Sequence, residues 1–471
     1  MKRFFKWMRW CGLGAGGLLG FGLILSLDTV DYQPYFHTEY YQHTLARWRQ
    51  RAVIHAAHGE VQAGLGITRL TPTVHATQDV PGQGQFRSLP LAGYGSRQGR
   101  PATGVHDDLY VKAVALQVED RLGVMVGVDA LIIPAEVTDL VMQRLETETD
   151  LRREQVYLSA THTHSGFGGW GEGLVAEAFA GPFQPGARVW LAEQIVAAIG
   201  AAVADLQPAL LAQGCFDAPE LIRNRLVGDL GKVDPEFSWL WLRRSGGRGI
   251  VLGSYSAHAT VLSGNSMLFS ADYPGGWQRA VEAATGDAAI FLAGAVGSQS
   301  PVAKGDDGFD RAEQMGHALA RQTLAELTHA ALTNRATFDF LGLEVSLPPL
   351  NVRVSDGIRL RPWLARKLLP VRPRSFLQVF RINDTLWMST PCDFSAELAL
   401  GIKDHLRARG HRGVITSFNG GYIGYVVPAR YYHLNGYEPR LMSFFGPNVP
   451  DYFDELLRTM ATDVLGPSSA R

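Results

Sequence analysis

Two histidines two positions apart follow an apolar stretch in LSATHTHSGFGGW, residues 158–170. In an extended chain alternate side chains point to the same side, so His162 and His164 are expected on one face. Two imidazoles on one face can bind one metal ion, or one can bind while the other transfers a proton. The other interpretation of this spacing is a hydrogen-bonded structural pair, and the sequence motif alone leaves both open.

Three more predicted strands run from apolar residues into a polar or glycine-rich end: SYSAHAT, LAGAVGSQSP and SFNGGYIGY. Rigid strands that end in such residues are where α/β proteins usually carry their functional groups. The four strand ends together therefore predict one functional site built from distant segments.

Each further candidate also has a structural interpretation. His258, after IVLGSYSA, is typical of a hydrogen-bonded core histidine, and Asp393 in TPCDFSAEL fits a helix N-cap. Tyr422 and Tyr425 fit packing positions, and Ser300 in GSQSP fits a turn before proline. Ser300 is not in a GxSxG motif, so an α/β-hydrolase triad is not supported.

The segments that must position these residues alternate between strand and helix patterns. Period-two or continuous apolar runs predict strands within 111–131, 155–160, 249–259, 289–297, 340–347, 376–383, 386–390 and 413–421. Amphipathic patterns predict helices within 135–151, 189–206, 275–285, 309–330 and 395–408. Interleaved elements predict an α/β fold with layered mixed β-sheets flanked by helices, in one large domain over 59–471. Residues 345–375, rich in Pro and Arg, are the least regular stretch and are expected to form an insertion or surface loop.

The amino terminus differs from the rest of the chain. MKRFFKWMRW is basic, and Cys11–Leu27 contains no charged residue. This pattern predicts a signal anchor, or a signal peptide, over 1–27, followed by a juxtamembrane helix or stalk over 28–58. An uncleaved anchor would hold the body outside the cytoplasm at the membrane, whereas cleavage would give a secreted protein. A buried core helix is the third interpretation.

Composition excludes some classes of function. The formal net charge is −1 and the pI about 6.9, so nothing indicates nucleic-acid binding. The three cysteines form no CxxC pair, so any metal ligands would be His, Asp, Glu or Tyr.

Several stretches occur in an order that resembles the neutral/alkaline, non-lysosomal ceramidase family. They are GLGITRLTP, AGYGSRQGRPATGVHDDLYVKAVAL, LSATHTHSGFGG, NR at 224–225, HAT with SADYPG, GSQSP, PCDFSAELALG and YIGYVVPARYYHLNGYEP. The resemblance covers roughly residues 60–450, and it makes 59–471 a ceramidase-like catalytic domain. It implies a zinc-dependent hydrolase that cleaves the amide bond of an N-acyl lipid such as ceramide.

The resemblance also implies roles for individual residues. The zinc ligands would be His162, His258, Asp393 and Tyr425. His164 would lie beside the metal, with Arg225, Ser300 and Tyr437 as further active-site residues. His106 is a possible member without an assigned role.

This sequence departs from the family pattern at three places. The usual PGE motif is PCD here, so the carboxylate of Asp393 is one methylene shorter. The family's NxGDVSP is AVGSQSP, and TTxEEY is VVPARYY. These changes indicate a different substrate or a reduced activity. Three alternatives therefore stay open: an amidohydrolase-type metal barrel, a metal-free serine esterase acting through Ser300, and a catalytically silent membrane-anchored lipid-binding or scaffold protein.

Overall fold

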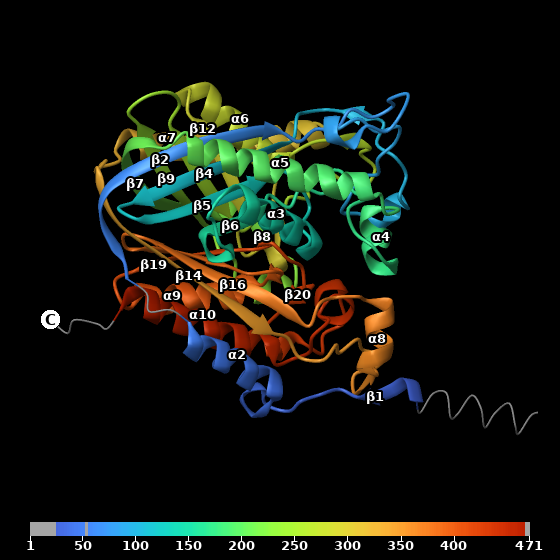
Figure 1. The fold of residues 1–471 in the computed structure, drawn as a ribbon. Coiled ribbons are helices and arrows are strands. Elements are labelled where there is room, and N and C mark those ends of the chain that lie inside the picture. Colours follow the sequence, from blue (N-terminus) through green and yellow to red (C-terminus); the bar gives the residue numbers. More distant parts are fainter. Residues whose placement is uncertain (1–24, 52–54, 467–471) are drawn as a thin grey trace, which may run out of the picture.

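The computed structural model describes residues 25–51 and 55–466 (Figure 1). Nearly all of the predicted anchor segment 1–27 lies outside the described residues. Within the described chain, the predicted mixture of β-sheet and flanking helices in one large domain is confirmed.

Twelve strands of the described chain form one branched, mixed sheet. Its main path runs β12-β10-β9-β7-β2-β14-β16-β17-β19, and β4, β5 and β6 branch from β2. The long strand β2 makes the branch because its first half pairs with β14 and its second half with β4. The bounds are β2 Ala57–Arg69, β4 Tyr110–Val118, β5 Arg121–Val128, β6 Val156–Ala160, β7 Gln207–Asp217, β9 Glu236–Arg244, β10 Ile250–Tyr255, β12 Ala288–Ala293, β14 Arg335–Ser346, β16 Arg374–Ile382, β17 Thr385–Ser389 and β19 Arg412–Thr416.

Short strands pair outside this sheet. The pairs are β1 (Leu27–Thr29) with β15 (Ile358–Leu360), β3 (Gly104–Val105) with β11 (Leu268–Phe269), β8 (Ile222–Asn224) with β13 (Gln299–Pro301), and β18 (Asp393–Phe394) with β20 (Tyr425–Val426).

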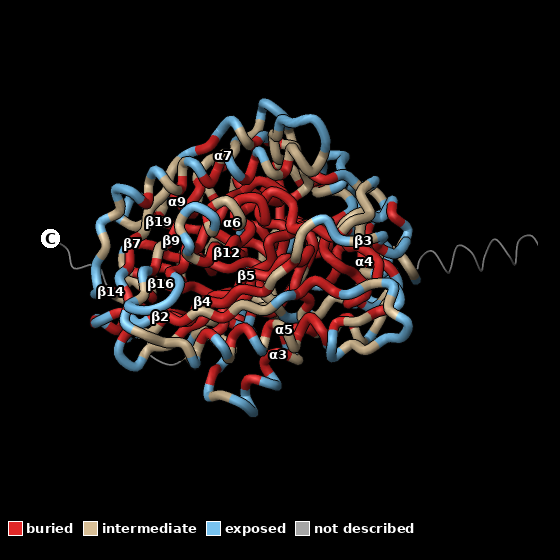
Figure 2. The backbone as a smooth tube through the Cα atoms, turned by 90° about the horizontal axis from the view of Figure 1, so that it is seen from above, coloured by how far each residue is buried: buried red, intermediate tan, exposed pale blue. Residues whose placement is uncertain are grey.

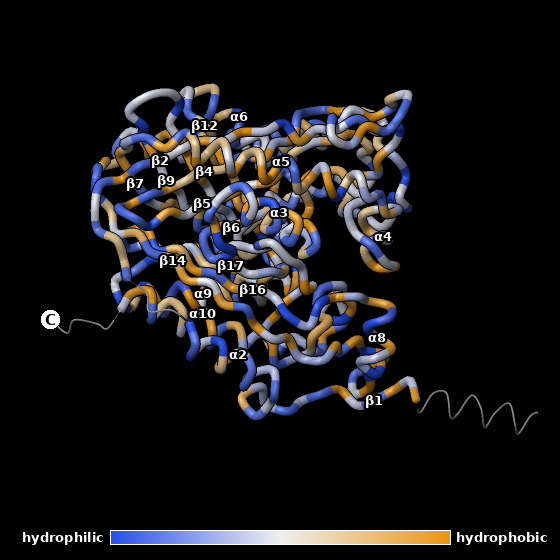
Figure 3. Tube along the Cα trace, viewed as in Figure 1, coloured by the Kyte–Doolittle hydropathy of each residue, from blue (hydrophilic) through white to orange (hydrophobic). Residues whose placement is uncertain are grey.

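Helices cover the outside of the sheet, and a buried core fills the space between its two halves (Figures 1 and 2). Helices α3 and α5 lie on the β2–β4 side, α6 and α7 on the β9–β12 side, and α2, α9 and α10 on the β14–β19 side. In Figure 3 these outer helices alternate apolar and polar residues, as surface helices do. The helix bounds are α2 Glu39–Gln50, α3 Ala135–Glu148, α4 Leu174–Ala180, α5 Pro185–Ala204, α6 Asp272–Thr285, α7 Gly308–Thr328, α8 Pro362–Leu368, α9 Ala396–Arg407 and α10 Val449–Leu465.

Helix α5 lies unusually close to the sheet. A Cβ on Gly64 or Gly66 of β2 would come within 1.9 Å of the carbonyl oxygen of Ala202 or Ala198, so only glycine fits there. Among the described helices, α5 is the one long and apolar enough to cross a membrane, but it buries Leu191, Ile195 and other residues against the sheet. These contacts are those of a core helix.

The predicted strands and helices listed above are present, with ends shifted by a few residues. The stretch predicted as a juxtamembrane helix or stalk contains α2, which packs against β14 and contacts α10 through Tyr452. The stretch 345–375 contains only β15 and α8 as regular elements between the ends of β14 and β16.

Candidate metal centre and active site

The four strand ends singled out in the sequence meet at one place. His162 follows β6, His258 follows β10, Val296 follows β12 and Phe418 follows β19. The carbonyl of Val296 accepts a hydrogen bond of 3.3 Å from Nδ1 of His258, and the Phe418 ring stacks on His162 at 3.8 Å. The expectation of one site built from distant strand ends is therefore met by the fold.

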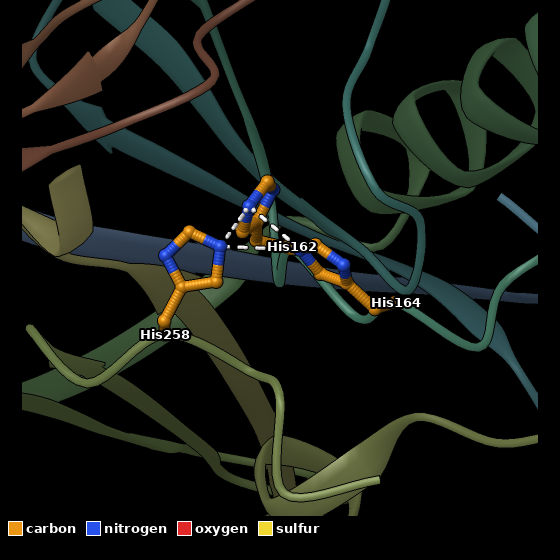
Figure 4. Close-up of side chains that lie close together, drawn as sticks. All are labelled: His162, His164 and His258. Atoms are coloured by element: carbon orange, nitrogen blue, oxygen red, sulfur yellow. Dashed lines mark hydrogen bonds between the residues drawn. The ribbon is translucent and has the colours of Figure 1, made fainter. Parts of the chain in front are cut away.

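Three imidazole nitrogens converge at the centre of this site (Figure 4). Nε2 of His162 lies 2.8 Å from Nε2 of His258, and Nε2 of His164 lies 3.2 Å and 3.1 Å from these two atoms. His162 and His258 are buried, whereas His164 is partly exposed. The exposed edge of the cluster is thus the side of His164.

The protonation of the rings leaves lone pairs at the centre. Nδ1 of His162 donates to the Leu131 carbonyl at 2.6 Å and Nδ1 of His258 to that of Val296, so in the neutral rings each Nε2 is unprotonated. Burial lowers the pKa of His162 to about 3 and those of His164 and His258 well below the usual value, which keeps all three neutral. Facing lone pairs at such distances repel unless a cation lies between them.

The carboxylate of Asp393 faces the same point. Its Oδ1 is 3.7 Å from Nε2 of His162, is buried, and has no hydrogen-bond partner in the described chain, while Oδ2 accepts from the Tyr422 hydroxyl at 2.8 Å. Burial raises the pKa of Asp393 to about 7, against the opposing effect of the Arg225 charge. Helix α9 begins at Ala396 with Ser395 at its N-cap position, so Asp393 is not the cap.

Tyr425 is placed beside Asp393 by the pairing of β18 with β20, in which the two residues are opposite each other. Its hydroxyl accepts a 2.8 Å hydrogen bond from Arg225, whose Nε also pairs with Glu438 at 2.9 Å. Burial and the nearby Asp393 raise the pKa of Tyr425 well above its usual value. The Tyr437 ring lies edge-on to that of Tyr425 at 5.8 Å, and Tyr437 is 51% exposed.

Residues that the sequence did not single out hold the cluster in place. A Cβ on Gly93 would lie 2.6 Å from Nδ1 of His164, and the φ of Gly93 is +112°, so this position requires glycine. The fully buried Arg97 donates to the carbonyls of Ala92 and His164. His162 itself has φ of 62°, a strained conformation that the packing around it must stabilise. The AGYGSRQG stretch was the sequence signal for Gly93 and Arg97.

Ser300 and His106 lie outside the hydrogen bonds of this cluster. Ser300 is in β13, opposite Arg223 of β8, and no hydrogen bond between its hydroxyl and a histidine is found in the described chain. Of the two serines in GSQSP, Ser298 is the buried one, and its hydroxyl donates a hydrogen bond to Glu397 at 2.7 Å. His106 stacks on Phe309 and contacts Asp107.

The donor set fits a zinc ion. Two ligands about 2.0–2.1 Å from a tetrahedral zinc lie about 3.3 Å apart, close to the separations of the three Nε2 atoms. Neutral imidazoles together with a carboxylate oxygen that lacks a hydrogen bond are the ligands such a site requires. The donors that converge in the described chain are the Nε2 atoms of His162, His164 and His258, with Oδ1 of Asp393 beside them. The family resemblance implies that His162, His258, Asp393 and Tyr425 would hold the ion, with His164 beside it.

Metal affinity should depend on pH through the carboxyl group. Since the Asp393 pKa is raised to about 7 while the imidazoles stay neutral, metal binding should release one proton below pH 7. We expect zinc affinity to fall about tenfold per pH unit between about pH 7 and about pH 5.5, measured with a competing chelator. Three ordinary histidines would give a much steeper loss, and an Asp393→Asn variant should give a flat profile. A loss of zinc affinity of a hundredfold or a thousandfold per pH unit, which means that two or three protons are released, would contradict Asp393 as the group that titrates.

A cavity of about 610 Å³ adjoins the cluster on the side of Tyr422. Its wall is largely apolar and comes from α3, α4, the segment after α8 and the turn 420–423. It includes Ile132, Met142, Trp170, Phe179, Leu369, Phe376 and Ile423. Tyr422 lies in this wall and also donates to Asp393, so one side chain joins the cavity to the candidate metal centre.

The same arrangement of elements is found in known proteins. A crystal structure of neutral ceramidase from Pseudomonas aeruginosa superimposes with a TM-score of 0.71 at 22% identity, covering 86% of this chain and 74% of that one. A ceramidase complexed with C2 gives a TM-score of 0.71 at 21% identity, covering 86% and 75%. At these identities the likeness shows the fold.

Sequence comparison reaches the family. The neutral ceramidase of Pseudomonas aeruginosa is 27% identical over an alignment of 237 residues that covers 46% of this chain and 35% of the relative. The match therefore spans about a third of that protein. The model of the family "Neutral/alkaline non-lysosomal ceramidase, N-terminal" matches residues 76–314, just over half of the chain. The chain belongs to the neutral/alkaline non-lysosomal ceramidase family.

Proposed function

We propose that this protein is a zinc-dependent amidase that hydrolyses an N-acyl lipid of the ceramide type to a fatty acid and an amine. The observation that carries the proposal is the convergence of His162, His164 and His258 with the unpaired Oδ1 of Asp393, in a ceramidase fold. A non-catalytic lipid-binding protein would have no need for neutral imidazoles and an unpaired carboxylate oxygen around one point.

The residues around the cluster have the chemistry that amide hydrolysis needs. A bound zinc ion would activate a water molecule and polarise the amide carbonyl. We propose that His164, at the exposed edge of the cluster, takes a proton from the attacking water and returns it to the leaving amine. Arg225 and Tyr437 offer donors to the oxygen on which negative charge develops. Tyr422 and Arg225 orient Asp393 and Tyr425.

The lipid character of the substrate is supported by the apolar cavity at Tyr422. Its volume is within the range of about 300–1,000 Å³ that small-molecule sites occupy. We also propose that residues 1–27 anchor the protein, with the body outside the cytoplasm, which would keep the enzyme near a bilayer-resident substrate.

The test is a metal analysis and a substrate panel on the purified full chain. The panel contains ceramides of different acyl chains, N-acyl ethanolamines, N-acyl amino acids and the matched esters. We expect bound zinc, turnover of at least one N-acyl lipid, and loss of turnover on chelation that returns with zinc. Turnover that persists in the metal-free protein, or esters as the sole substrates, would contradict the proposal.

Replacing Ser300 separates the proposed reaction from serine esterase chemistry. No hydrogen bond joins Ser300 to a histidine in the described chain, so we do not expect its hydroxyl to act as an activated nucleophile. If Ser300 only hydrogen-bonds the substrate, Ser300→Ala should lower kcat by about 10–100-fold and leave the zinc content unchanged. A metal-free serine esterase would instead lose all turnover in this variant and none on chelation. Parallel measurements of kcat and zinc content decide between them.

A further inference from the structure

Large apolar side chains are exposed together on one side of the molecule. In the described chain they lie on the two sides of β1, in and just before β15, on α8 and in the segment 432–441. They are Leu25, Tyr32, Val354, Ile358, Trp363, Leu368, Leu434, Tyr437 and Leu441. Most large apolar side chains that are exposed anywhere in the described chain belong to this group. Exposed apolar side chains that form one contiguous patch mark an interaction site.

Contacts between the segments show that this is one continuous surface. Strand β1 pairs with β15, which directly precedes α8 (Figure 1). Tyr32 hydrogen-bonds to His433 at 3.1 Å, and Arg353 donates to the carbonyl of Pro439. We call this surface, made of the nine side chains above and the basic residues of α8, the α8 face.

The α8 face is also basic. Residues 352–374 contain seven arginines or lysines and one acid, Asp356, in a chain whose formal net charge is −1. Asp356 pairs with Arg440. Three of the seven cations also pair with carboxylates of other segments: Arg359 with Asp28, Arg372 with Glu136 and Asp139, and Arg374 with Glu344. In contrast, no ion pair joins Arg366 or Lys367 to a carboxylate in the described residues, and the ammonium of Lys367 lies 5.4 Å from the Trp363 ring centre.

We propose that the α8 face is a membrane-docking surface that binds the headgroup region of a bilayer containing anionic lipids. An exposed tryptophan and leucines flanked by unpaired cations fit the interface between headgroups and acyl chains, where apolar side chains are buried and basic ones meet lipid phosphates.

The position of the α8 face relative to the rest of the chain supports a bilayer as its partner. The described chain begins at Leu25, shortly before β1, and β1 and α8 lie side by side in Figure 1. The basic and apolar residues 1–24 directly precede Leu25 in the sequence. The cavity at Tyr422 is lined by residues 369–376, which directly follow α8. Tyr437 belongs both to the α8 face and to the candidate active site. Docking would therefore place the cavity and the active-site edge next to the lipid.

Hydrogen–deuterium exchange of the full chain, reconstituted in nanodiscs, tests the proposal without relying on catalysis. We expect amides of 358–370 to exchange more slowly in phosphatidylcholine–phosphatidylglycerol nanodiscs than in phosphatidylcholine alone, and salt to reduce the difference. Arg366→Gln/Lys367→Gln should abolish the difference, because each cation near an anionic surface contributes about fivefold to the binding affinity. Lys304→Gln/Arg335→Gln, which removes two exposed cations elsewhere, should keep it. Equal exchange in both lipids would overturn the proposal.

A second measurement relates docking to the reaction and rests on the proposed function. Trp363→Ser/Leu368→Ser should lower turnover of an N-acyl lipid in anionic vesicles about tenfold and leave a short-chain soluble analogue unaffected. Leu210→Ser/Leu230→Ser, at exposed apolar positions outside the face, should change neither rate. Equal losses on both substrates in the α8 variant would reject a docking role. If no amide is turned over by the unaltered chain, the proposed function fails while the exchange result still decides on docking.

Discussion

His162→Ala and His258→Ala should each remove the bound zinc and lower kcat by at least about 10³-fold, since each deletes one of the converging Nε2 ligands. Both rings are buried and anchored through Nδ1 to a backbone carbonyl, so no neighbouring side chain can take their place. Zinc content by elemental analysis and kcat on the best N-acyl substrate are the two measurements.

His106→Ala is the matched control for these variants. His106 stacks on Phe309 and, in the described chain, has no hydrogen bond or ring contact with the three histidines, so its removal should preserve zinc and turnover. Circular dichroism should show the same secondary structure in all three variants. Full zinc occupancy with unchanged kcat in His162→Ala would reject its assignment as a ligand.

Asp393→Asn should weaken zinc binding by about 100-fold or more, because the amide carries no negative charge to compensate that of the ion. In the unaltered protein Oδ1 is left free for the metal while Tyr422 holds Oδ2. Zinc titration against a chelator of known affinity measures the effect, and kcat at saturating zinc shows whether the carboxylate acts beyond metal binding.

Tyr422→Phe keeps the charge and removes only the hydrogen bond, so its loss of zinc affinity should be smaller, about tenfold. Asp393→Glu restores the residue that the family usually has at this position. If Asp393→Asn binds zinc as tightly as the unaltered chain, the carboxylate is no ligand, and the cluster is one of imidazoles alone.

Many of the strands and helices could be predicted from the sequence, because the spacing of apolar residues within a segment is set by the strand or helix that the segment forms. The period-two and helical spacings of apolar residues identify β4, β5, β6 and the helices α3, α6, α7 and α9. Polar strand ends identified the segments of His162, His258 and Ser300, and each of the four predicted ends contributes a histidine, or a side chain or carbonyl in contact with one. The roles of individual residues came from the family resemblance and remain predictions.

Other features depend on contacts between distant segments, which a single sequence does not encode visibly. The branch at β2, the close approach of α5 and the register that sets Asp393 opposite Tyr425 are of this kind. Tyr422 has the pattern of a packing residue, and only the three-dimensional structure shows its hydroxyl on Asp393. The composition of 345–375 identified this basic stretch as irregular. The α8 face could not be predicted, because the apolar residues near β1 and in 432–441 that complete it are more than 50 residues away along the chain.

The most direct test is anomalous diffraction at the zinc edge from crystals of the zinc-loaded full chain. We expect one strong peak per chain among Nε2 of His162, Nε2 of His258 and Oδ1 of Asp393, with Nε2 of His164 facing it. An active protein whose crystals show no peak there, or a peak at another place, would contradict this expectation.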